Sequence, residues 1–412
     1  MNAGGTRGAT LALGLTLVAA QGIGAQATAT APPATRGGDE RGALRLGGGD
    51  DVALTLGGYV QVDGRWISGA ASRQPDGVLL RRARLVFDAA MPSGWHVRLQ
   101  PDFGQGRVLV QDAFAGREGA STIFRAGRFR PAFGTERMQS SSTLLFPERG
   151  IVNSLMPSRS FGAQWQWMPA AWRVALGGFR TPIGSDVVPV DTDGDVDLVA
   201  GSGHDVLVRV ARDFSGAGYM ADVQAGVLTG SERGTVDAPA IGRVLSVAQQ
   251  PILAFRDDGT ELGTVRAAGR RTRLSAGGLF GTRAHLVAFE GALLRQRVQR
   301  GATLYEPSVS AVAVRVARVW NADRLRSQEL LPRSARGAIE VGARGGVVSA
   351  WGEGLASLVT RASSTHARTG GVAVSWLPSS LTRLTMAYDL TDRRSDTAPH
   401  EHALLIRWQQ GF

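Results

Sequence analysis

The chain has 412 residues, with 55 glycines, no cysteine and a formal net charge of +11. This length suits one large domain or two small ones, and the lack of cysteine excludes disulfides as a source of stability. All 46 positive charges are arginines. Because they are spread along the chain, we expect no nucleic-acid partner. Two explanations of the arginine usage are open: a GC-rich genome, or recognition of oxyanions, which the forked guanidinium suits.

The first 27 residues have the features of a secretory signal peptide. Arg7 supplies a positive charge, Leu11–Ala20 an apolar core, and Ala25-Gln26-Ala27 a small-residue cleavage site. Residues 28–50 are rich in Ala, Gly, Pro and charge and are predicted to be a flexible linker, followed by one domain over residues 51–412. No run of about 18 apolar residues follows the signal, so we expect no transmembrane helix. The export signal leaves a periplasmic protein, a protein exported further, or a membrane β-barrel.

The domain begins with apolar and polar residues in alternation. Over residues 54–66, alternate positions carry leucine, valine, glycine and tryptophan, and the positions between them carry Tyr59, Gln61, Asp63 and Arg65. A period of two is typical of a β-strand with one apolar and one polar face.

Further strands are predicted at 79–89, 95–103, 108–115 and 122–129, and around 312–316 and 384–390. In the first of these, Leu79 and Phe87 are assigned to the apolar face and Arg82 and Arg84 to the polar face. Tryptophans near strand ends resemble the interfacial girdle of a membrane barrel: Trp66, Trp95, Trp320 and Trp376.

The last segment favours a membrane barrel over a secreted β-sandwich. Leu404, Ile406, Trp408 and Phe412 continue one apolar face, although Gln410 interrupts it. Bacterial outer-membrane barrels usually end on such an aromatic residue, which their assembly machinery reads, so we expect these four residues to be a membrane-assembly signal. The fold class predicted is all-β: a transmembrane antiparallel β-barrel of about sixteen strands.

Motifs along the chain resemble one known family. LLRRARLVFDAAMPSGWHVRLQPDFG begins at residue 79 and is followed by QDAFAG, RAGRFRPAFGTERMQSSSTLLFPERG and SRSFGAQW. Downstream come GRRTRLS at 269–275, HLVAFEG at 285–291, ARGAIEVGAR at 335–344 and the terminal RWQQGF. In this order and spacing they resemble the phosphate-selective porin O and P family, over nearly the whole mature chain.

The resemblance implies a homotrimer of barrels in which the loop after the fifth strand folds inward and narrows the pore. Strand parity, counted from a periplasmic N-terminus, independently places residues 131–160 on the extracellular side. Arg81 and Arg82 match arginines that attract anions into the vestibule. We expect both near the outer mouth, with Arg82 pointing inward and Arg81 at headgroup height; the alternative is a lipid-headgroup anchor.

In the inward loop, Arg137 and Arg149 match the basic members of two acid-base pairs, and Ser140 and Ser141 match hydroxyl donors. Asp102 matches a carboxylate beside the constriction. Arginines and hydroxyls replace hydration that an oxyanion loses, while a carboxylate keeps binding weak enough for release. The alternative is that the neighbouring glutamates, Glu136 and Glu148, pair with these arginines and pin the loop.

Two departures from the family pattern weaken the case for phosphate. Tyr59 follows Gly57-Gly58 where the family often has an arginine, and Arg137 replaces the lysine of the phosphate-selective members. Arginine is not a compact point charge, so selectivity for anions in general is also open.

Other signals are weaker. Asp191–Asp197 has oxygen donors at alternate positions but lacks the glycine and glutamate of a calcium loop, so a solvated acidic loop, able to bridge divalent cations, is preferred. His400-Glu401-His402 could bind a metal or lie in a periplasmic turn. We expect no metal site, no cofactor and no enzyme, since no histidine stands beside a recognisable nucleophile.

The predicted function is a passive, anion-selective diffusion channel, for phosphate or another oxyanion, in the outer membrane of a Gram-negative-type bacterium. Its expected partners are small anions, outer-membrane lipid, the barrel assembly machinery and further copies of the chain. The second prediction is a general porin with weak anion preference. A plugged barrel acting as an enzyme or adhesin is the third.

Overall fold

The computed structural model describes residues 44–46, 52–69, 76–106, 108–182, 200–326, 333–394 and 400–412. Contacts divide the chain into Met1–Pro32 and Pro33–Phe412, and every described residue lies in the second unit. The predicted signal peptide and the acidic loop Asp191–Asp197 lie outside the described residues. So does the predicted linker, apart from β1 (Leu44–Leu46), a short strand within it.

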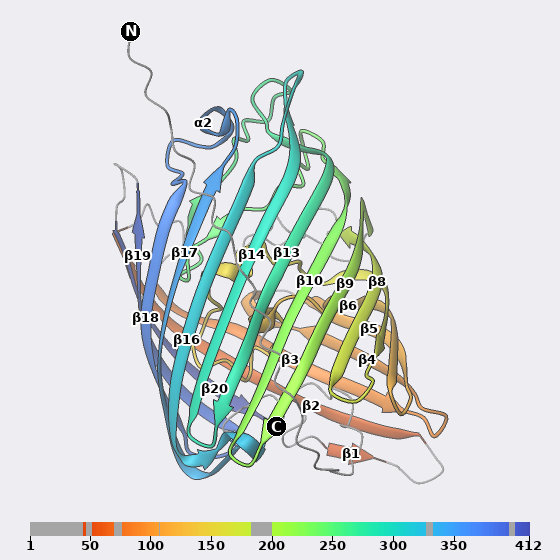
Figure 1. Ribbon diagram of the computed structural model, residues 1–412. Helices are drawn as coiled ribbons and strands as arrows, with labels where there is room; N and C mark the ends of the chain where they lie inside the picture. Colours follow the sequence, from red (N-terminus) through yellow and green to blue (C-terminus); the bar gives the residue numbers. More distant parts are fainter. Residues whose placement is uncertain are drawn as a thin grey trace. The chain divides into compact units, whose positions relative to one another are not determined.

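Sixteen antiparallel strands within the described residues form a closed barrel (Figure 1), which confirms the predicted fold class and strand number. They are β2 (Ala53–Ser68), β3 (Gly77–Ala90), β4 (Trp95–Asp102), β5 (Leu109–Glu118), β6 (Thr122–Phe129), β7 (Ser160–Trp167), β8 (Trp172–Pro182), β9 (Ala200–Gly216), β10 (Tyr219–Arg233), β13 (Arg266–Thr282), β14 (His285–Arg300), β16 (Ser308–Asp323), β17 (Arg333–Trp351), β18 (His366–Leu377), β19 (Thr382–Arg393) and β20 (His400–Gly411). Each pairs with the next in this order.

Smaller elements complete the described chain. The barrel sheet also carries β1 and β15 (Thr303–Tyr305), and a hairpin of β11 (Val244–Leu245) and β12 (Pro251–Leu253) lies between β10 and β13. The helical turns are α1 (Thr135–Met138), α2 (Leu355–Leu358), η1 (Gly104–Gly106), η2 (Ile151–Leu155) and η4 (Arg324–Arg326). Among the described residues, no helix has the length and hydropathy needed to cross a membrane.

Pairing between β2 and β20 closes the barrel, in a register that runs from Tyr59 opposite Gly411 to Ser68 opposite His402. Beyond it, the backbone of Phe412 exchanges two hydrogen bonds with Gly58, both 3.1 Å long. Closure pairs both edge strands of the sixteen-stranded wall that the structure describes, the condition for a sheet to exist inside a bilayer.

The predicted alternation sets the two faces of the wall. In β20, Trp408 is 44% exposed on the outside, whereas Arg407 is 4% exposed and points inward. The four tryptophans expected in a girdle are all exposed on the outer face. Trp95, Trp320 and Trp376 lie close to the turns at one end of the strands, and Trp66 lies toward the other end.

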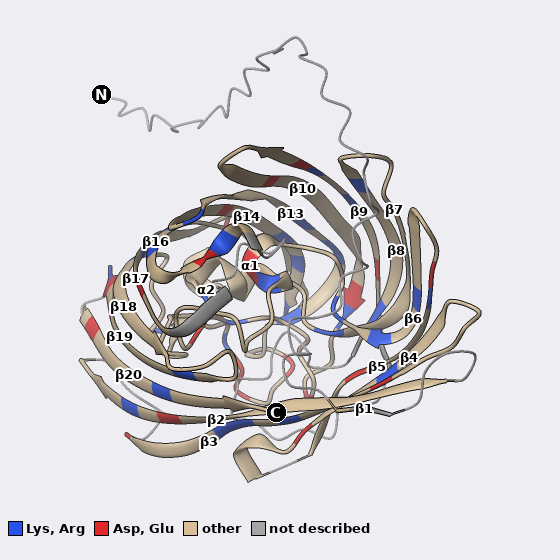
Figure 2. Ribbon diagram, turned by 90° about the horizontal axis from the view of Figure 1, so that it is seen from below, with Lys and Arg blue, Asp and Glu red and all other residues tan. Residues whose placement is uncertain are grey.

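The two ends of the barrel differ. The connections 91–94, 119–121, 168–171, 217–218, 283–284 and 378–381 are tight turns and meet at one end, here called the turn end. The long connections 130–159, 234–265 and 352–365 leave the strands at the other end, the loop end. Two of these long connections contain α1 and α2: α1 lies within the ring of strands in Figure 2, and α2 lies above the tip of β17 in Figure 1.

An apolar core fills part of the interior. It joins Phe133, Ile151 and Leu155 of the first long connection to Leu253 of the second and Leu355 of the third. Inward-facing wall residues such as Phe129, Phe179, Leu207 and Leu228 complete it. The three long connections therefore pack against one another inside the barrel.

His400-Glu401-His402 begins strand β20 at the loop end, so the expectation that it lies in a turn was wrong. Strand alternation separates the three side chains: Glu401 is buried and pairs with Arg393, while His400 and His402 are exposed. His402 Nδ1 lies 2.6 Å from the Tyr388 hydroxyl. Among the described residues, no cluster of histidine and acidic side chains has the geometry of a metal site.

Candidate anion path in the barrel lumen

Residues 130–159, between β6 and β7, form a loop that crosses the lumen. The loop is mostly buried and contains α1 and η2. Side chains of β2, β10, β14, β16, β17, β19 and β20 bond to it, so it is held from most of the wall. We call it the constriction loop.

Four wall arginines surround one carboxylate of the constriction loop, Glu148. Arg81 Nε lies 2.9 Å from Glu148 Oε1, and the nearest nitrogens of Arg65 and Arg407 lie 3.3 Å from the same oxygen. Arg82 Nη2 approaches Oε2 at 3.9 Å. All five side chains are nearly fully buried. Charge-assisted bonds in such surroundings are stronger than neutral ones, so Glu148 is a principal anchor of the loop.

A β-bulge places two consecutive arginines on the inner face, which corrects the expectation for Arg81. Gln61 is opposite Arg82, but the next residue, Val62, is opposite Leu80, so Arg81 is the extra residue of β3. A bulge lets neighbouring side chains leave the strand on the same side. Arg81 therefore lies in the lumen on Glu148 and not at headgroup height.

The same bulge also changes which residues of β3 face inward. Between the bulge and the loop end, the inward and outward positions are exchanged. Leu79 is opposite the inward-facing Asp63, and directly opposite residues share a face, so Leu79 points inward. Leu80 and Val78 are exposed in its place. The assignment of Leu79 to the apolar face was wrong for this reason.

The predicted hydroxyl and carboxylate positions meet beside β2 and β3. Ser141 Oγ is 2.7 Å from the Tyr59 hydroxyl and 3.1 Å from Arg84 Nη1. Arg84 Nε in turn donates to Asp102 at 2.6 Å. Ser140 directly precedes Ser141, and its hydroxyl is 2.9 Å from that of Ser142. Tyr59 thus uses its hydroxyl to hold the constriction loop at the position where the family pattern has an arginine.

Arg137 and Arg149 bond to the constriction loop itself. Arg137 Nε donates to the carbonyl of Pro157 at 2.9 Å, and Arg149 Nη2 to that of Gln139 at 2.6 Å. Burial lowers the pKa of Arg149 to about 10, with the attraction of Glu136 opposing that shift. The guanidinium therefore keeps its charge at neutral pH.

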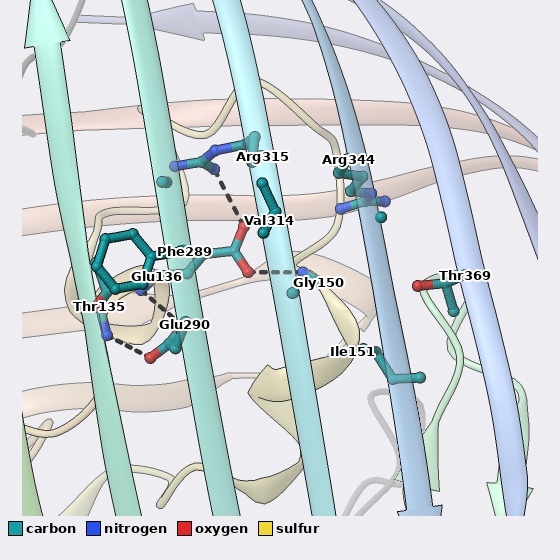
Figure 3. Close-up of a pocket in the computed structure, with 13 residues that line it drawn as sticks. Thr135, Glu136, Gly150, Ile151, Phe289, Glu290, Val314, Arg315, Arg344 and Thr369 are labelled. Atoms are coloured by element: carbon teal, nitrogen blue, oxygen red, sulfur yellow. Dashed lines mark hydrogen bonds and ion pairs between the residues drawn. The ribbon is translucent and has the colours of Figure 1, made fainter. Parts of the chain in front are cut away.

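Glu136 joins the constriction loop to the opposite wall, as Figure 3 shows. Its carboxylate is 3.2 Å from Arg315 Nη1 of β16 and accepts the backbone N–H of Gly150 at 2.7 Å. Glu290 of β14 accepts the backbone N–H groups of Thr135 and Glu136 at the start of α1. The two glutamates do pin the loop, but they do so on wall arginines, whereas the expectation had given them Arg137 and Arg149 as partners.

A pocket lies between the constriction loop and β14 to β18 (Figure 3). Its empty space is about 460 Å³, part of which is open solvent, and it is bordered by Glu136, Glu290, Arg315, Arg344 and Thr369, among others. Arg344 makes a bidentate pair with Asp389, at 2.9 and 2.8 Å, and donates to the carbonyl of Glu148 at 2.6 Å. The pocket therefore joins charged groups of both signs beside the loop.

Residues 55–249 match the family model described as phosphate-selective porin O and P. This part of the chain resembles that family. The match includes β2 to β10 and the constriction loop, and it confirms the resemblance seen in the motifs. A comparison with curated protein sequences gives no match.

Solved structures show the same porin fold. The outer membrane channel DcaP of Acinetobacter baumannii aligns with a TM-score of 0.58 at 10% identity, over 88% of this chain and 98% of its own. The trimer form of OmpT from Vibrio cholerae aligns at 0.53 and 10%, over 88% and 100%. An anion-selective porin from Comamonas acidovorans gives the same four values. The family match and this fold together support an outer-membrane channel.

Three residues of this site were not predicted from the sequence: Arg315, Arg344 and Glu290. A signal for Arg315 was present, because Val314 and Val316 belong to a predicted alternating strand and the residue between them must face inward. Arg344 closes one of the quoted motifs, but nothing in its spacing indicated Asp389 or the constriction loop as partners.

The anchor at Glu148 makes a prediction for acid stability. Burial alone raises the pKa of this carboxyl, but attraction to Arg81, Arg82, Arg407 and Arg65 outweighs it and holds the pKa well below its ordinary value. A carboxyl with a lowered folded-state pKa stabilises the fold above its unfolded pKa of about 4.3, and this stabilisation is lost as pH falls toward the folded value. The urea concentration at the midpoint of unfolding, measured in lipid vesicles, should therefore stay constant from pH 7 to 5 and decrease below pH 4.

Glu148→Gln should give a shallower acid slope than the wild type. Glu353→Gln, which changes an exposed glutamate between β17 and β18, is the matched control and should keep the wild-type slope. Equal slopes in all three proteins would mean that Glu148 does not determine how stability depends on pH.

Proposed function

We propose that this porin is a passive, anion-selective channel of the outer membrane, with phosphate or another oxyanion as its favoured cargo. The observation that carries the proposal is the arginine cluster where the constriction loop meets β2, β3 and β20. Arg65, Arg81, Arg82 and Arg407 converge there on the carboxylates of Asp63 and Glu148. The cluster therefore keeps an excess of positive charge in the lumen.

An excess positive field raises the local concentration of anions and their rate of entry, and salt screens this effect. Anions would gather at the loop end, shed part of their hydration beside the constriction loop and leave into the periplasm without an energy source. The residues proposed for this path are Arg81, Arg82, Asp102, Arg137, Ser140, Ser141 and Arg149. Arg315 and Arg344, on the opposite side of the loop, are added to them.

A general porin with weak anion preference is the second candidate, and one observation favours it. Several lumen arginines are matched one to one with carboxylates, as in the pairs Arg344–Asp389 and Arg393–Glu401. Paired charges form dipoles whose fields fall off faster than those of single charges. The apolar core formed by the three long connections is the observation that supports the third candidate, a plugged barrel.

We further propose that the barrel assembles as a homotrimer and that its loop end faces outward. Outer-membrane barrels keep short turns in the periplasm and longer loops outside, which supports this orientation. The exposed Trp408 and Phe412, in line with Leu404 and Ile406, support the proposed recognition of β20 by the barrel assembly machinery.

Planar bilayers test the proposal directly. Under a KCl gradient, the wild-type porin should give a reversal potential of the sign expected for chloride permeation. A cation-selective potential would contradict it, and the absence of conductance would favour the plugged barrel.

Added phosphate should reduce the chloride current through the porin, and it should do so less in Arg137→Ala. Arg368→Ala, on the outer face of β18, is the control and should behave as wild type. Indifference to phosphate would leave the general porin.

A further inference from the structure

The outer wall at the loop end carries exposed arginines, whereas those in the lumen are buried. Arg180 of β8, Arg270 of β13 and Arg297 of β14 are exposed on the outer face. Among the described residues, no carboxylate lies within ion-pairing distance of any of the three. Their guanidinium groups are therefore accessible to an anionic ligand from the surroundings of the barrel.

Strand register brings these arginines into one row. Arg180 is opposite His204, His204 is opposite Ser231, and Ser231 is opposite Arg270. Directly opposite residues in antiparallel strands point to the same face, so the row is continuous on the outside of β8, β9, β10 and β13. Figure 1 shows these strands side by side in the wall.

An irregularity in pairing extends the row onto β14. Between Ala267 and Arg271 the register with β14 shifts, which sets Arg297 opposite a stretch that includes Arg270. The Cδ atom of Arg297 lies 3.7 Å from the position that a Cβ on Gly269 would take. The row thus ends with two neighbouring arginines.

An apolar band runs below the row. On β9, the outward positions after His204 are Val206, Val208 and Val210, all exposed. The next outward residue, Arg212, lies between the rings of Trp172 and Phe214, 4.9 Å from each centroid, near the turn end. The basic row is therefore the loop-end boundary of the band, level with the outer leaflet if the short turns are periplasmic.

We propose that Arg180, His204, Ser231, Arg270 and Arg297 form a binding row for the phosphate groups of an anionic glycolipid in the outer leaflet. Arginine suits phosphate because its fork donates two parallel hydrogen bonds, and His204 and Ser231 add further hydrogen-bonding groups between the charges. The apolar band would contact the acyl chains. Both parts of the surface match one amphiphile, whereas a free phosphate ion would use the row alone.

Native mass spectrometry of the detergent-solubilised porin tests this surface. The probes are lipid A with both phosphates and monophosphoryl lipid A. The row variant is Arg180→Gln with Arg270→Gln and Arg297→Gln. The matched control is Arg117→Gln with Arg212→Gln and Arg318→Gln, which removes three outward charges near the turn end. Heat-modifiable migration on a gel checks that each barrel has folded.

The wild type and the control should bind lipid A alike, and the row variant at least about tenfold less tightly, since each arginine near a membrane surface contributes measurably to anionic lipid binding. Monophosphoryl lipid A should bind the wild type less tightly than lipid A. If the triple variant does not fold, Arg270→Gln alone should give a smaller loss.

Equal affinity in wild type and row variant would overturn the proposal, as would equal losses in both triple variants, which would indicate net charge alone. Light scattering identifies a different occupant: if the row variant changes only the oligomeric state, the surface is an interface between copies of the chain. If inorganic phosphate competes for the row as effectively as lipid A does, the row is a site for free anions and not for a glycolipid.

Discussion

Replacing Glu148 by glutamine is expected to lower the free energy of unfolding by about 3–5 kcal/mol, the usual effect of removing one member of a buried ion pair. Arg65, Arg81, Arg82 and Arg407 would then face a neutral amide, with Asp63 as the remaining carboxylate of the cluster. The loss is large because these guanidinium groups are buried and cannot turn to bulk water. Urea unfolding of the porin in lipid vesicles at pH 7 measures it.

Glu353→Gln separates this effect from loss of a negative charge as such. Glu353 is exposed between β17 and β18, so its removal should change stability by less than about 0.5 kcal/mol. If Glu148→Gln resembles this control, the arginine cluster does not depend on Glu148, and the constriction loop is held by its backbone contacts.

Arg315→Gln is expected to reduce the permeability to anions by about twofold to twentyfold and to raise that to cations by a similar factor, which lowers the ratio of anion to cation permeability. A unit charge about 10 Å from a passing ion changes its energy by about 0.4–1.7 kcal/mol, for effective dielectric constants between 80 and 20. The variant also leaves Glu136 without its partner at 3.2 Å, beside Glu290, which adds to the negative field of the pocket. Reversal potentials in planar bilayers under a KCl gradient measure the ratio.

Arg318→Gln is the matched control. It removes the same charge from the same strand, but Arg318 is on the outer face, over the ring of Trp320 at 5.0 Å. Selectivity should stay at the wild-type value. Equal shifts in both variants would mean that total charge governs selectivity, and no shift in either would place the ion path away from this pocket.

The strands could be predicted because apolar and polar residues alternate along each of them, and this period of two is typical of a β-strand. The segments expected at 54–66, 79–89 and 122–129 coincide with β2, β3 and β6 to within two residues. Register was the part that sequence could not supply. In LLRRAR the extra residue of a bulge could be any of several, and the pairing with β2 and the charge of Glu148 decide that it is Arg81.

The candidate site was predictable only in part, for a related reason. Resemblance to a family pointed to the right loop, and the loop does fold inward. What each side chain does there depends on partners far away in the sequence: Arg315 bonds to Glu136 across 179 positions. Local pattern predicts which face a residue occupies, but not which groups meet across the lumen.

Closure of the barrel by β2 and β20 has a consequence for the order of folding. The pair Arg407–Asp63 joins residues 344 positions apart, and Arg407 also binds Glu148, which Arg65 of β2 holds from the other side. Contacts this distant in sequence form slowly, because the entropy of closing the intervening chain must be overcome first. Closing the wall and completing the anchor of the constriction loop are thus one event, so a nascent barrel that still lacks β20 has both an open edge and an unfinished pore.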